Sequence, residues 1–203
     1  MSPHHSPTRP SRPRGARALL AALCAIALVI PAGQAGAWIE GSTYTQLGGP
    51  ITPTSPDAWA GAGRTVSGDG QVVGIGGVTL TAPDFLAFAQ MFTRDTAGDW
   101  QPMGAPLDFT VESGGVSVAV DLSLSADGSR VAVAIQEGGA GRVEVFTWTG
   151  QAWVRDGGPL TNPSRPNASL FGEHLTMSSD GLSLLVPPLL YVRDAGAWVH
   201  SGR

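Results

Sequence analysis

The sequence has almost no cysteine. Its one cysteine, Cys24, lies inside an apolar run near the N-terminus, and the residue before it, Leu23, is a poor fit to the small residue of a lipoprotein signal. If this run is removed as a signal peptide, no thiol remains to form a disulfide. The rest of the chain, about 165 residues, must therefore be held together by its own hydrophobic core or by assembly.

Lysine is absent as well, so all 12 basic residues are arginines. Four of them, Arg9, Arg12, Arg14 and Arg17, precede the apolar run, and no acidic residue accompanies them. The chain beyond residue 37 keeps 8 arginines against 16 acidic residues, a formal net charge of −8. Because the number of cations sets the affinity of a protein for a phosphate backbone, we expect neither nucleic acid nor an anionic membrane surface as a partner.

The N-terminal segment is predicted to be a secretory signal peptide. Its arginine-rich start leads into the apolar run Ala18–Ile30, and Ala35-Gly36-Ala37 supplies small residues for cleavage. A helix needs roughly 20 residues to cross a bilayer, so this run of 13 residues argues against the alternative of an uncleaved anchor. We predict a signal peptide at residues 1–37 and a secreted, extracellular or periplasmic domain at residues 38–203, without membrane insertion after cleavage.

Sustained helical spacing is missing from this domain, apart from a weak stretch at Asp84–Met91. Glycine, proline, threonine, serine and aspartate instead interrupt short runs of valine, isoleucine, leucine and phenylalanine. This pattern is typical of an all-β sandwich, barrel or propeller.

Two patterns recur in the same order along the domain. The first is an aromatic residue followed four positions later by glycine and then by proline and an aliphatic residue. It begins at Tyr44, Trp100 and Trp153, with a truncated copy at Trp198, at spacings of 56, 53 and 45 residues. The second is Ser-x-Asp-Gly, with its aspartate at Asp69, Asp127 and Asp180, at spacings of 58 and 53. Two patterns with nearly the same period indicate tandem repeats.

The clearest copy, Leu122–Leu160, has the sequence pattern of a four-stranded antiparallel unit. Apolar residues alternate along its first strand, and Asp127-Gly128 predicts a type I′ hairpin turn with positive φ at both residues. Four antiparallel strands in about 50 residues, repeated, are typical of a propeller blade. The predicted strands are Val116–Ser125, Arg130–Gln136, Arg142–Trp148 and Ala152–Asp156.

The other copies are less regular. The earlier one turns at Asp69-Gly70 and reaches a third strand near Phe88–Arg94, while the last one is interrupted by Pro187-Pro188, which cannot lie in a central strand. Inter-blade links are expected at Pro50–Ala62 and Thr161–Gly172. We predict an all-β, β-propeller-like fold of tandem four-stranded antiparallel blades, about three and a half in number. The partial blade covers 38–51, and the blades cover about 55–107, 108–160 and 161–203.

The segment from Leu122 to Trp153 resembles the repeats of FG-GAP/integrin-α-like propellers, and is similar to WD40-like and kelch-like repeats. The resemblance covers most of Tyr44–Trp198. It implies four-stranded blades and, for the integrin type, a calcium loop with several acids. Each hairpin here has a single aspartate, Asp69, Asp127 or Asp180, whereas calcium takes six to eight oxygen ligands. We therefore interpret these aspartates as turn residues and expect no metal.

No recognised catalytic motif is present, and we expect no catalytic or cofactor-binding residues and no cofactor. His174 and His200 lie far apart in the sequence. Gly74-Ile75-Gly76-Gly77 lies in a strand pattern rather than before a helix, so it does not predict a phosphate loop. The repeated tryptophans are better explained by packing between blades than by sugar stacking. Asn167 begins a glycosylation sequon that is used only in a eukaryote.

Three and a half blades fall short of the four to eight of closed propellers, and open sheet edges invite pairing. The chain could be a piece of a longer propeller, could close the gap with its own N-terminal half-blade, or could join a second chain. We expect a secreted or cell-surface recognition module without catalysis that binds protein or glycan through its loops. The alternatives are a secreted sialidase-like hydrolase using Arg64, Arg94, Arg130 and Arg142, and a truncated propeller without an independent function.

Overall fold

The computed structural model describes residues 46–54, 58–79, 86–109, 117–137, 140–165 and 171–201. The predicted signal peptide and Asn167 lie outside these ranges. Within them every regular element is a β-strand, and none of the described residues forms a helix long and apolar enough to span a membrane.

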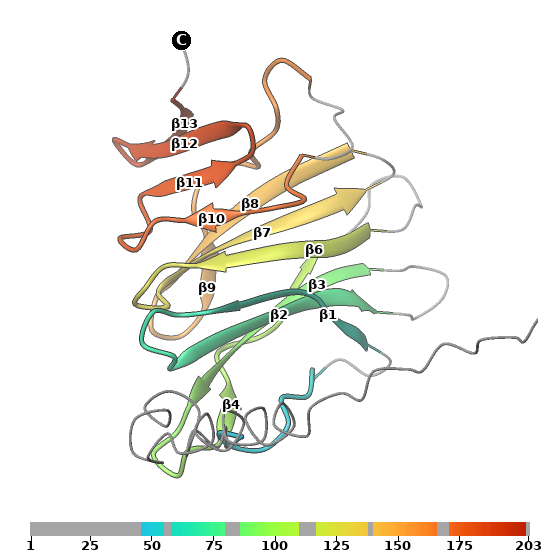
Figure 1. Ribbon diagram of the computed structural model, residues 1–203, viewed down its shortest axis with the longest axis vertical. Coiled ribbons are helices and arrows are strands. Elements are labelled where there is room, and N and C mark those ends of the chain that lie inside the picture. The colour runs from blue at the N-terminus through green and yellow to red at the C-terminus, as the bar shows by residue number, and fades with distance from the viewer. Residues whose placement is uncertain are drawn as a thin grey trace, which may run out of the picture. The chain divides into compact units, whose positions relative to one another are not determined.

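The strands form three antiparallel sheets, which follow one another along the chain (Figure 1). We call them blade A, blade B and blade C. Blade A has the strand order β1-β2-β3-β4, and the short β5 also pairs with β3. Its strands are β1 (Ala58–Val66), β2 (Val72–Thr79), β3 (Leu86–Arg94), β4 (Trp100–Pro102) and β5 (Leu107–Phe109).

Blades B and C each have four strands in sequence order, β6-β7-β8-β9 and β10-β11-β12-β13. This arrangement confirms the predicted all-β, propeller-like fold. The strands of blade B are β6 (Ser117–Leu124), β7 (Arg130–Glu137), β8 (Ala140–Trp148) and β9 (Trp153–Arg155). Those of blade C are β10 (Thr176–Met177), β11 (Ser183–Val186), β12 (Leu189–Asp194) and β13 (Ala197–His200).

The observed strands lie close to the predicted ones. β3 (Leu86–Arg94) contains the third strand predicted near Phe88–Arg94, so the weak helical spacing of Asp84–Met91 corresponds to no helix in its described part. Strand β1 begins at Ala58, inside the predicted link Pro50–Ala62. The described part of the predicted partial blade, residues 46–51, contains no strand. Pro187-Pro188 stands in the turn between β11 and β12, as its effect on a strand requires.

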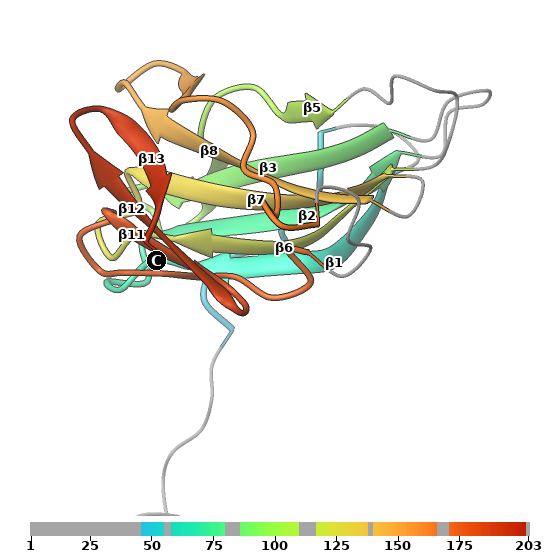
Figure 2. The same cartoon turned by 90° about the horizontal axis from the view of Figure 1, so that it is seen from above.

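Blade B is buried on both faces. Along β7, Val131, Val133 and Ile135 belong to the apolar core shared with blade A, whereas Ala132 and Ala134 belong to the core shared with blade C. Because side chains alternate between the two faces of a strand, this central strand is apolar at every one of these positions. Viewed from above, the long strands of the blades lie side by side (Figure 2).

Candidate functional site: the interfaces between the blades

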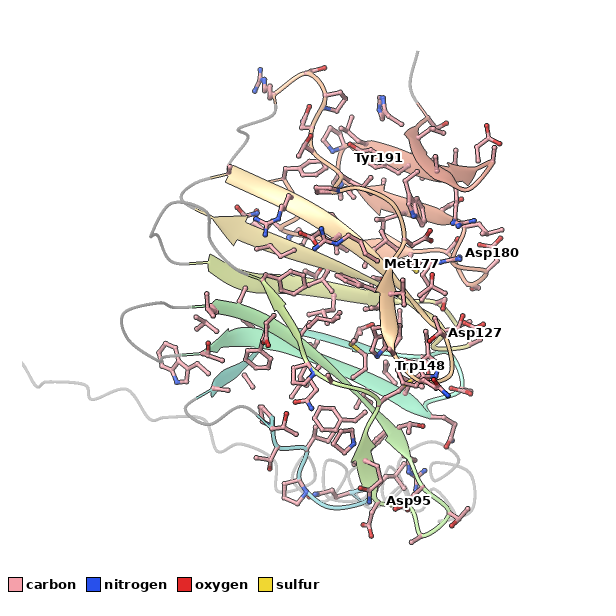
Figure 3. All side chains as sticks on the ribbon, turned by 180° about the vertical axis from the view of Figure 1, so that it is seen from behind. Asp95, Asp127, Trp148, Met177, Asp180 and Tyr191 are labelled. Atoms are coloured by element: carbon pink, nitrogen blue, oxygen red, sulfur yellow. The ribbon has the colours of Figure 1, made fainter. Side chains whose placement is uncertain are left out.

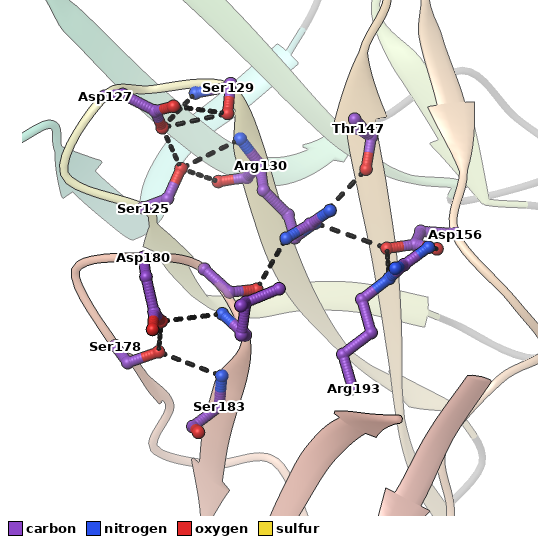
Figure 4. A network of polar contacts seen from close by, with 12 residues as sticks. Ser125, Asp127, Ser129, Arg130, Thr147, Asp156, Ser178, Asp180, Ser183 and Arg193 are labelled. Atoms are coloured by element: carbon purple, nitrogen blue, oxygen red, sulfur yellow. Dashed lines mark hydrogen bonds and ion pairs between the residues drawn. The ribbon is translucent and has the colours of Figure 1, made fainter. Parts of the chain in front are cut away.

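Each blade carries the Ser-x-Asp-Gly turn between its first two strands. Figure 4 shows the turns of blades B and C. In blade B the Ser125 hydroxyl donates to Asp127 Oδ1 over 2.6 Å, and the same oxygen accepts from the Ser129 N–H over 3.0 Å. Ser125 Oγ accepts from the Arg130 N–H over 3.0 Å. These bonds recur in blade A with Ser67 and Asp69 and in blade C with Ser178 and Asp180. The aspartates therefore organise the turns.

The turn differs from the predicted type I′. Ser125 N–H donates to the Arg130 carbonyl, so the loop between the strands has four residues rather than two. Gly128 has a φ of 68°, whereas Asp127 is not among the residues with positive φ. The physical reason is the Asp127 carboxylate, which accepts the N–H two residues ahead and fixes a longer loop with only glycine in the left-handed region.

The same hydrogen bonds hold the turn aspartates ionised. The Ser125 hydroxyl and then the Ser129 N–H lower the pKa of Asp127, because both stabilise the charged carboxylate. The pKa values of Asp69 and Asp180 are lowered in the same way by Ser67 and Ser178. Asp127 and Asp180 lie at the same end of their sheets (Figure 3). Across the described ranges no group of three or more His, Cys, Asp or Glu residues could hold a metal ion.

Hydrogen bonds join consecutive turns, in what we call the turn relay. The Gly68 N–H donates to the Ala126 carbonyl over 2.8 Å, and the Ala126 N–H donates to the Ser179 carbonyl over 3.0 Å. These three residues occupy the x position of Ser-x-Asp-Gly in the three repeats. The relay therefore couples neighbouring blades through groups that every residue except proline has, which makes it independent of side-chain identity.

A second set of bonds joins the first strands of neighbouring blades, and we call them the inner-strand bonds. Thr65 Oγ1 accepts from the Leu124 N–H over 3.1 Å, and Ser123 Oγ accepts from the Met177 N–H over 2.9 Å. Thr65 and Ser123 both stand two residues before the turn serine. Asp121 adds a third bond, from the Leu175 N–H to Oδ2 over 2.7 Å, between blades B and C.

The repeated tryptophans lie between repeats, as predicted. The Trp153 indole N–H donates to the Met103 carbonyl over 2.8 Å, and the Trp100 indole donates to the Leu47 carbonyl over 3.0 Å. Each acceptor is the third residue after the aromatic position of the preceding repeat. Trp198 is the exception, because its indole nitrogen approaches the Asp156 side chain but forms no hydrogen bond of ordinary geometry with a described residue.

Blades B and C are also joined by an ion-pair network centred on Asp156 (Figure 4). Arg193 forms a bidentate pair with Asp156, Nε to Oδ2 over 2.8 Å and Nη2 to Oδ1 over 2.9 Å. Arg130 Nε lies 3.2 Å from Oδ2, and Arg130 Nη1 donates to the Gly181 carbonyl over 2.8 Å. Thr147 Oγ1 accepts from Arg130 Nε over 3.2 Å. The network thus ties two strands of blade B to the turn and the third strand of blade C.

Two opposing effects act on Asp156. Burial raises its pKa, but the hydrogen bond and charge of Arg193, with the charge of Arg130, outweigh burial, so the pKa lies below its ordinary value. Asp156 is therefore ionised at neutral pH between two arginines. The two arginines share this one carboxylate, which joins Arg193 of blade C to Asp156 of blade B.

The four arginines on which the sialidase-like alternative rests do not converge in the structure. Arg130 is paired with Asp156, and Arg142 Nε lies 2.9 Å from Glu144 Oε1 in the interior of blade B. Arg94 donates to the Gly98 carbonyl in the β3–β4 turn, and Arg64 approaches the Gly61 carbonyl at 3.5 Å. Each guanidinium thus has its own local partner.

The remaining sequence candidates have structural roles or lie apart. His174 precedes β10 and His200 ends β13, at opposite edges of blade C, and the His200 ring lies 5.7 Å from that of Tyr191. Gly77 lies in β2, where a Cβ would lie 1.9 Å from the Trp59 carbonyl oxygen. The glycine is therefore required by close strand contact, and no phosphate loop is formed.

One pocket of about 360 Å³ lies beside the link between blades B and C. Its lining combines the apolar Phe171 and Leu189 with the polar Asn162, Ser164 and Arg165. No acid–base pair lines it, so the pocket offers packing and hydrogen bonding but no catalytic group among its lining residues. They are Asn162, Ser164, Arg165, Phe171, Pro187, Pro188 and Leu189.

Sequence reasoning missed Asp156 and Arg193, which are 37 residues apart. A signal was present in the repeat. Asp156 stands at the position of Leu47 and Met103 in the other copies, so the change from an apolar to a charged residue marks it. Nothing local indicates its partners, because Arg130 and Arg193 reach it from other strands.

No protein-family model matches the chain. No curated protein matches it either. Similar solved structures have propeller sheets. A chain from Bacteroides fragilis, provisionally named a 6-phosphogluconolactonase, is 17% identical, with a TM-score of 0.45, and the match covers 68% of this chain and 36% of that one. The periplasmic gluconolactonase of Pseudomonas aeruginosa is 16% identical, with a TM-score of 0.45, over 71% of this chain and 41% of that one.

These comparisons correct the predicted function. The prediction of a non-catalytic recognition module is wrong, because the similar chains bear the names of lactonases, which are enzymes. At this identity the likeness extends to the fold alone, so it assigns no activity to this chain. This chain spans about two fifths of the length of the chains it matches.

Proposed function

We propose that this chain works as an assembly unit that supplies three consecutive blades to a closed β-propeller. The proposal rests on the two outer faces of the blade series, that of blade A and that of blade C. Both carry apolar side chains at positions that are buried between blades elsewhere in the molecule. The aligned Ser-x-Asp-Gly turns define which residues are equivalent.

The free face of blade C is the stronger support. Leu185 pairs with Leu190 across β11 and β12, as Ala132 pairs with Val145 across β7 and β8. Leu185 and Leu190 are 41% and 39% exposed, whereas Ala132 and Val145, covered by blade C, are 0% and 1% exposed. Leu185 and Leu190 are thus larger and more apolar than their equivalents in blade B, although no described blade covers them. A next blade would remove this surface from water, which stabilises the assembly by roughly 25 cal/mol for each Å² buried.

The outer face of blade A gives the matching observation. Val66 is 59% exposed, whereas its equivalent Leu124 in blade B is 7% exposed beneath blade A. Val66 lies on β1, and no described blade packs against the outer side of this strand, whereas the equivalent strand β6 packs against β1 and β2 of blade A. An exposed apolar face of this kind favours packing against another sheet.

Hydroxyl-radical footprinting tests this function. In a dilute monomer we expect Leu190 and Val66 to be oxidised readily and their equivalents Val145 and Leu124 to be protected. In an assembled ring all four should be protected. Protection of Leu190 and Val66 in the dilute monomer would overturn the proposal, because the chain would then cover its own faces.

We also propose that the repeats belong to the FG-GAP, WD40 or kelch groups and that the chain is exported. The group membership is supported by the residue pattern of Leu122–Trp153. Export rests on the arginine-rich start, apolar run and cleavage residues of the first 37 positions. N-terminal sequencing of the mature protein tests export, and a new terminus at Trp38 is the expected result.

A further inference from the structure

We infer that the partner blades come from a second copy of this chain, and that two copies close a six-bladed ring. This inference rests on the proposed assembly function. It is carried by the polar groups at the two ends of the turn relay and of the inner-strand bonds. These groups are the donors and acceptors of the first and last repeats.

The turn relay has a direction, from an N–H in one blade to a carbonyl in the following blade. It runs from Gly68 to Ala126 and from Ala126 to Ser179. At the last blade the Ser179 N–H has no hydrogen-bond partner among the described residues, and at the first blade the Gly68 carbonyl has none. A Ser179 donor from one copy thus meets a Gly68 acceptor from the next copy if blade A follows blade C.

The inner-strand bonds lead to the same order. In each joint a hydroxyl two residues before the turn serine accepts the N–H of the residue one before the turn serine in the following blade. In blade C that hydroxyl belongs to Thr176, which is exposed and has no side-chain hydrogen bond to a described residue. In blade A the equivalent N–H belongs to Val66. Thr176 of one copy therefore matches Val66 of the other.

Both pairings continue the existing interfaces with the same atoms and the same polarity. A partner must offer a Ser-x-Asp-Gly turn with a free carbonyl at x and a free N–H before the serine. Blade A of this chain has both. If each copy joins its blade C to blade A of the other, the two joints are identical by a two-fold axis. The six blades fall within the four to eight of closed propellers.

The outer part of blade A limits where the joint forms. The Leu47 carbonyl already accepts from the Trp100 indole, and the Thr54 N–H donates to the buried Gln90 over 3.0 Å. The segment 46–54 thus lies against the outer strands of blade A. The joint is therefore made by the first strands and the turns, β10 of one copy beside β1 of the other. This geometry makes the relay atoms, rather than the outer strands, the contacts to test.

Light scattering after size exclusion tests the inference, with the full chain over a range of concentrations. We expect a species of twice the monomer mass. Thr176→Val removes the hydroxyl but keeps the shape, and Ser179→Pro removes the N–H. Because the ring has two identical joints, each variant removes two hydrogen bonds and should weaken the dimer about 30-fold, the effect of two bonds of about 1 kcal/mol each. Thr96→Val, in the exposed β3–β4 turn, is the matched control and should leave the dimer unchanged.

The other outcomes overturn the inference in distinguishable ways. A monomer at every concentration, with Leu190 and Val66 open to footprinting, excludes the second copy but leaves the assembly function in place. A dimer that neither variant weakens means that copies join elsewhere. Larger species that grow with concentration mean an open chain of copies rather than a two-fold ring. Circular dichroism of each variant verifies that the blades are folded.

Discussion

Met103 at the interface of blades A and B occupies the repeat position that Asp156 occupies at the interface of blades B and C. Around Met103 the contacts are apolar, and the Trp153 indole is satisfied by the Met103 carbonyl. Around Asp156 two arginines converge, and the Trp198 indole has no such bond. The turn relay and the inner-strand bonds are nevertheless the same at both interfaces.

The difference indicates which parts of a blade interface are fixed by the fold. Backbone groups and a single hydroxyl set the spacing and direction of the blades, while the side chains at the outer part vary from apolar to ionic. The first interface should therefore respond to packing changes alone. The second should respond to packing, pH and charge, and the following predictions separate these responses.

The largest loss of stability is expected from changes in the apolar cores, of which each interface has one. Leu184→Ala removes a fully buried side chain between blades B and C, and Met91→Ala does the same between blades A and B. Each should lower the free energy of unfolding by about 2–5 kcal/mol, because a cavity is added to the lost burial. Urea denaturation measures both, with the exposed Leu182→Ala as the control, expected within about 0.5 kcal/mol of wild type. A small loss for only one of the two would mean that its blade is not part of the cooperative unit.

The turn glycines come next, since they share one φ but differ in surroundings. Gly70 and Gly128 have φ values of 71° and 68°, so alanine at either is strained by about 1 kcal/mol. A Cβ at Gly128 would also lie 2.6 Å from Val72 Cγ2, whereas a Cβ at Gly70 would meet nothing within 4 Å. We expect Gly128→Ala to be less stable than Gly70→Ala by a further 1–3 kcal/mol, roughly, as overpacking costs. Equal losses in thermal unfolding would contradict the tight contact of the turn with blade A.

The ion-pair network should give a smaller loss. Asp156→Asn leaves Arg130 and Arg193 without their carboxylate, and both are partly exposed, so we expect a loss of about 1–2 kcal/mol, less than for a fully buried pair. Met103→Leu at the equivalent position of the other interface should cost less than about 1 kcal/mol, because volume and polarity are kept. If Asp156→Asn is as stable as wild type in chemical denaturation, the network contributes nothing to the joint.

The smallest effect is the pH dependence of the same network. Since the folded-state pKa of Asp156 lies below the ordinary value of 3.8, its contribution is complete above that value and is lost as the pH falls through the folded pKa. The stability difference between wild type and Asp156→Asn should therefore be constant above pH 5 and shrink below about pH 4. The turn aspartates titrate in both proteins and cancel in the difference. A difference that grows on acidification would mean that burial, not the arginines, controls Asp156.

The sequence was sufficient for the features that repeat. The Asp-Gly turns, the tryptophan positions and the alternation along β6 and β7 predicted four-stranded blades and their order. The type I′ turn was a wrong inference because loop length depends on the bond of Ser125 to Arg130, which two-residue patterns do not contain. The start of β1 was missed because Ala58–Ala62 is too rich in alanine and glycine to show alternation.

The features that occur only once were not predictable. Asp156 follows β9, and its arginines come from β7 and β12, so only the folded register brings the three residues together. The partial blade predicted at residues 38–51 stays a prediction, because residues 38–45 lie outside the described ranges.

Residue-resolved amide hydrogen exchange of the dilute monomer tests the turn relay most directly. The same N–H is hydrogen-bonded to the next blade in the first two repeats and has no partner among the described residues in the third. We expect slow exchange at Gly68 and Ala126, whose N–H groups donate across the interfaces, and fast exchange at Ser179. Slow exchange at Ser179 in the monomer, or fast exchange at Ala126 in the folded chain, would contradict it.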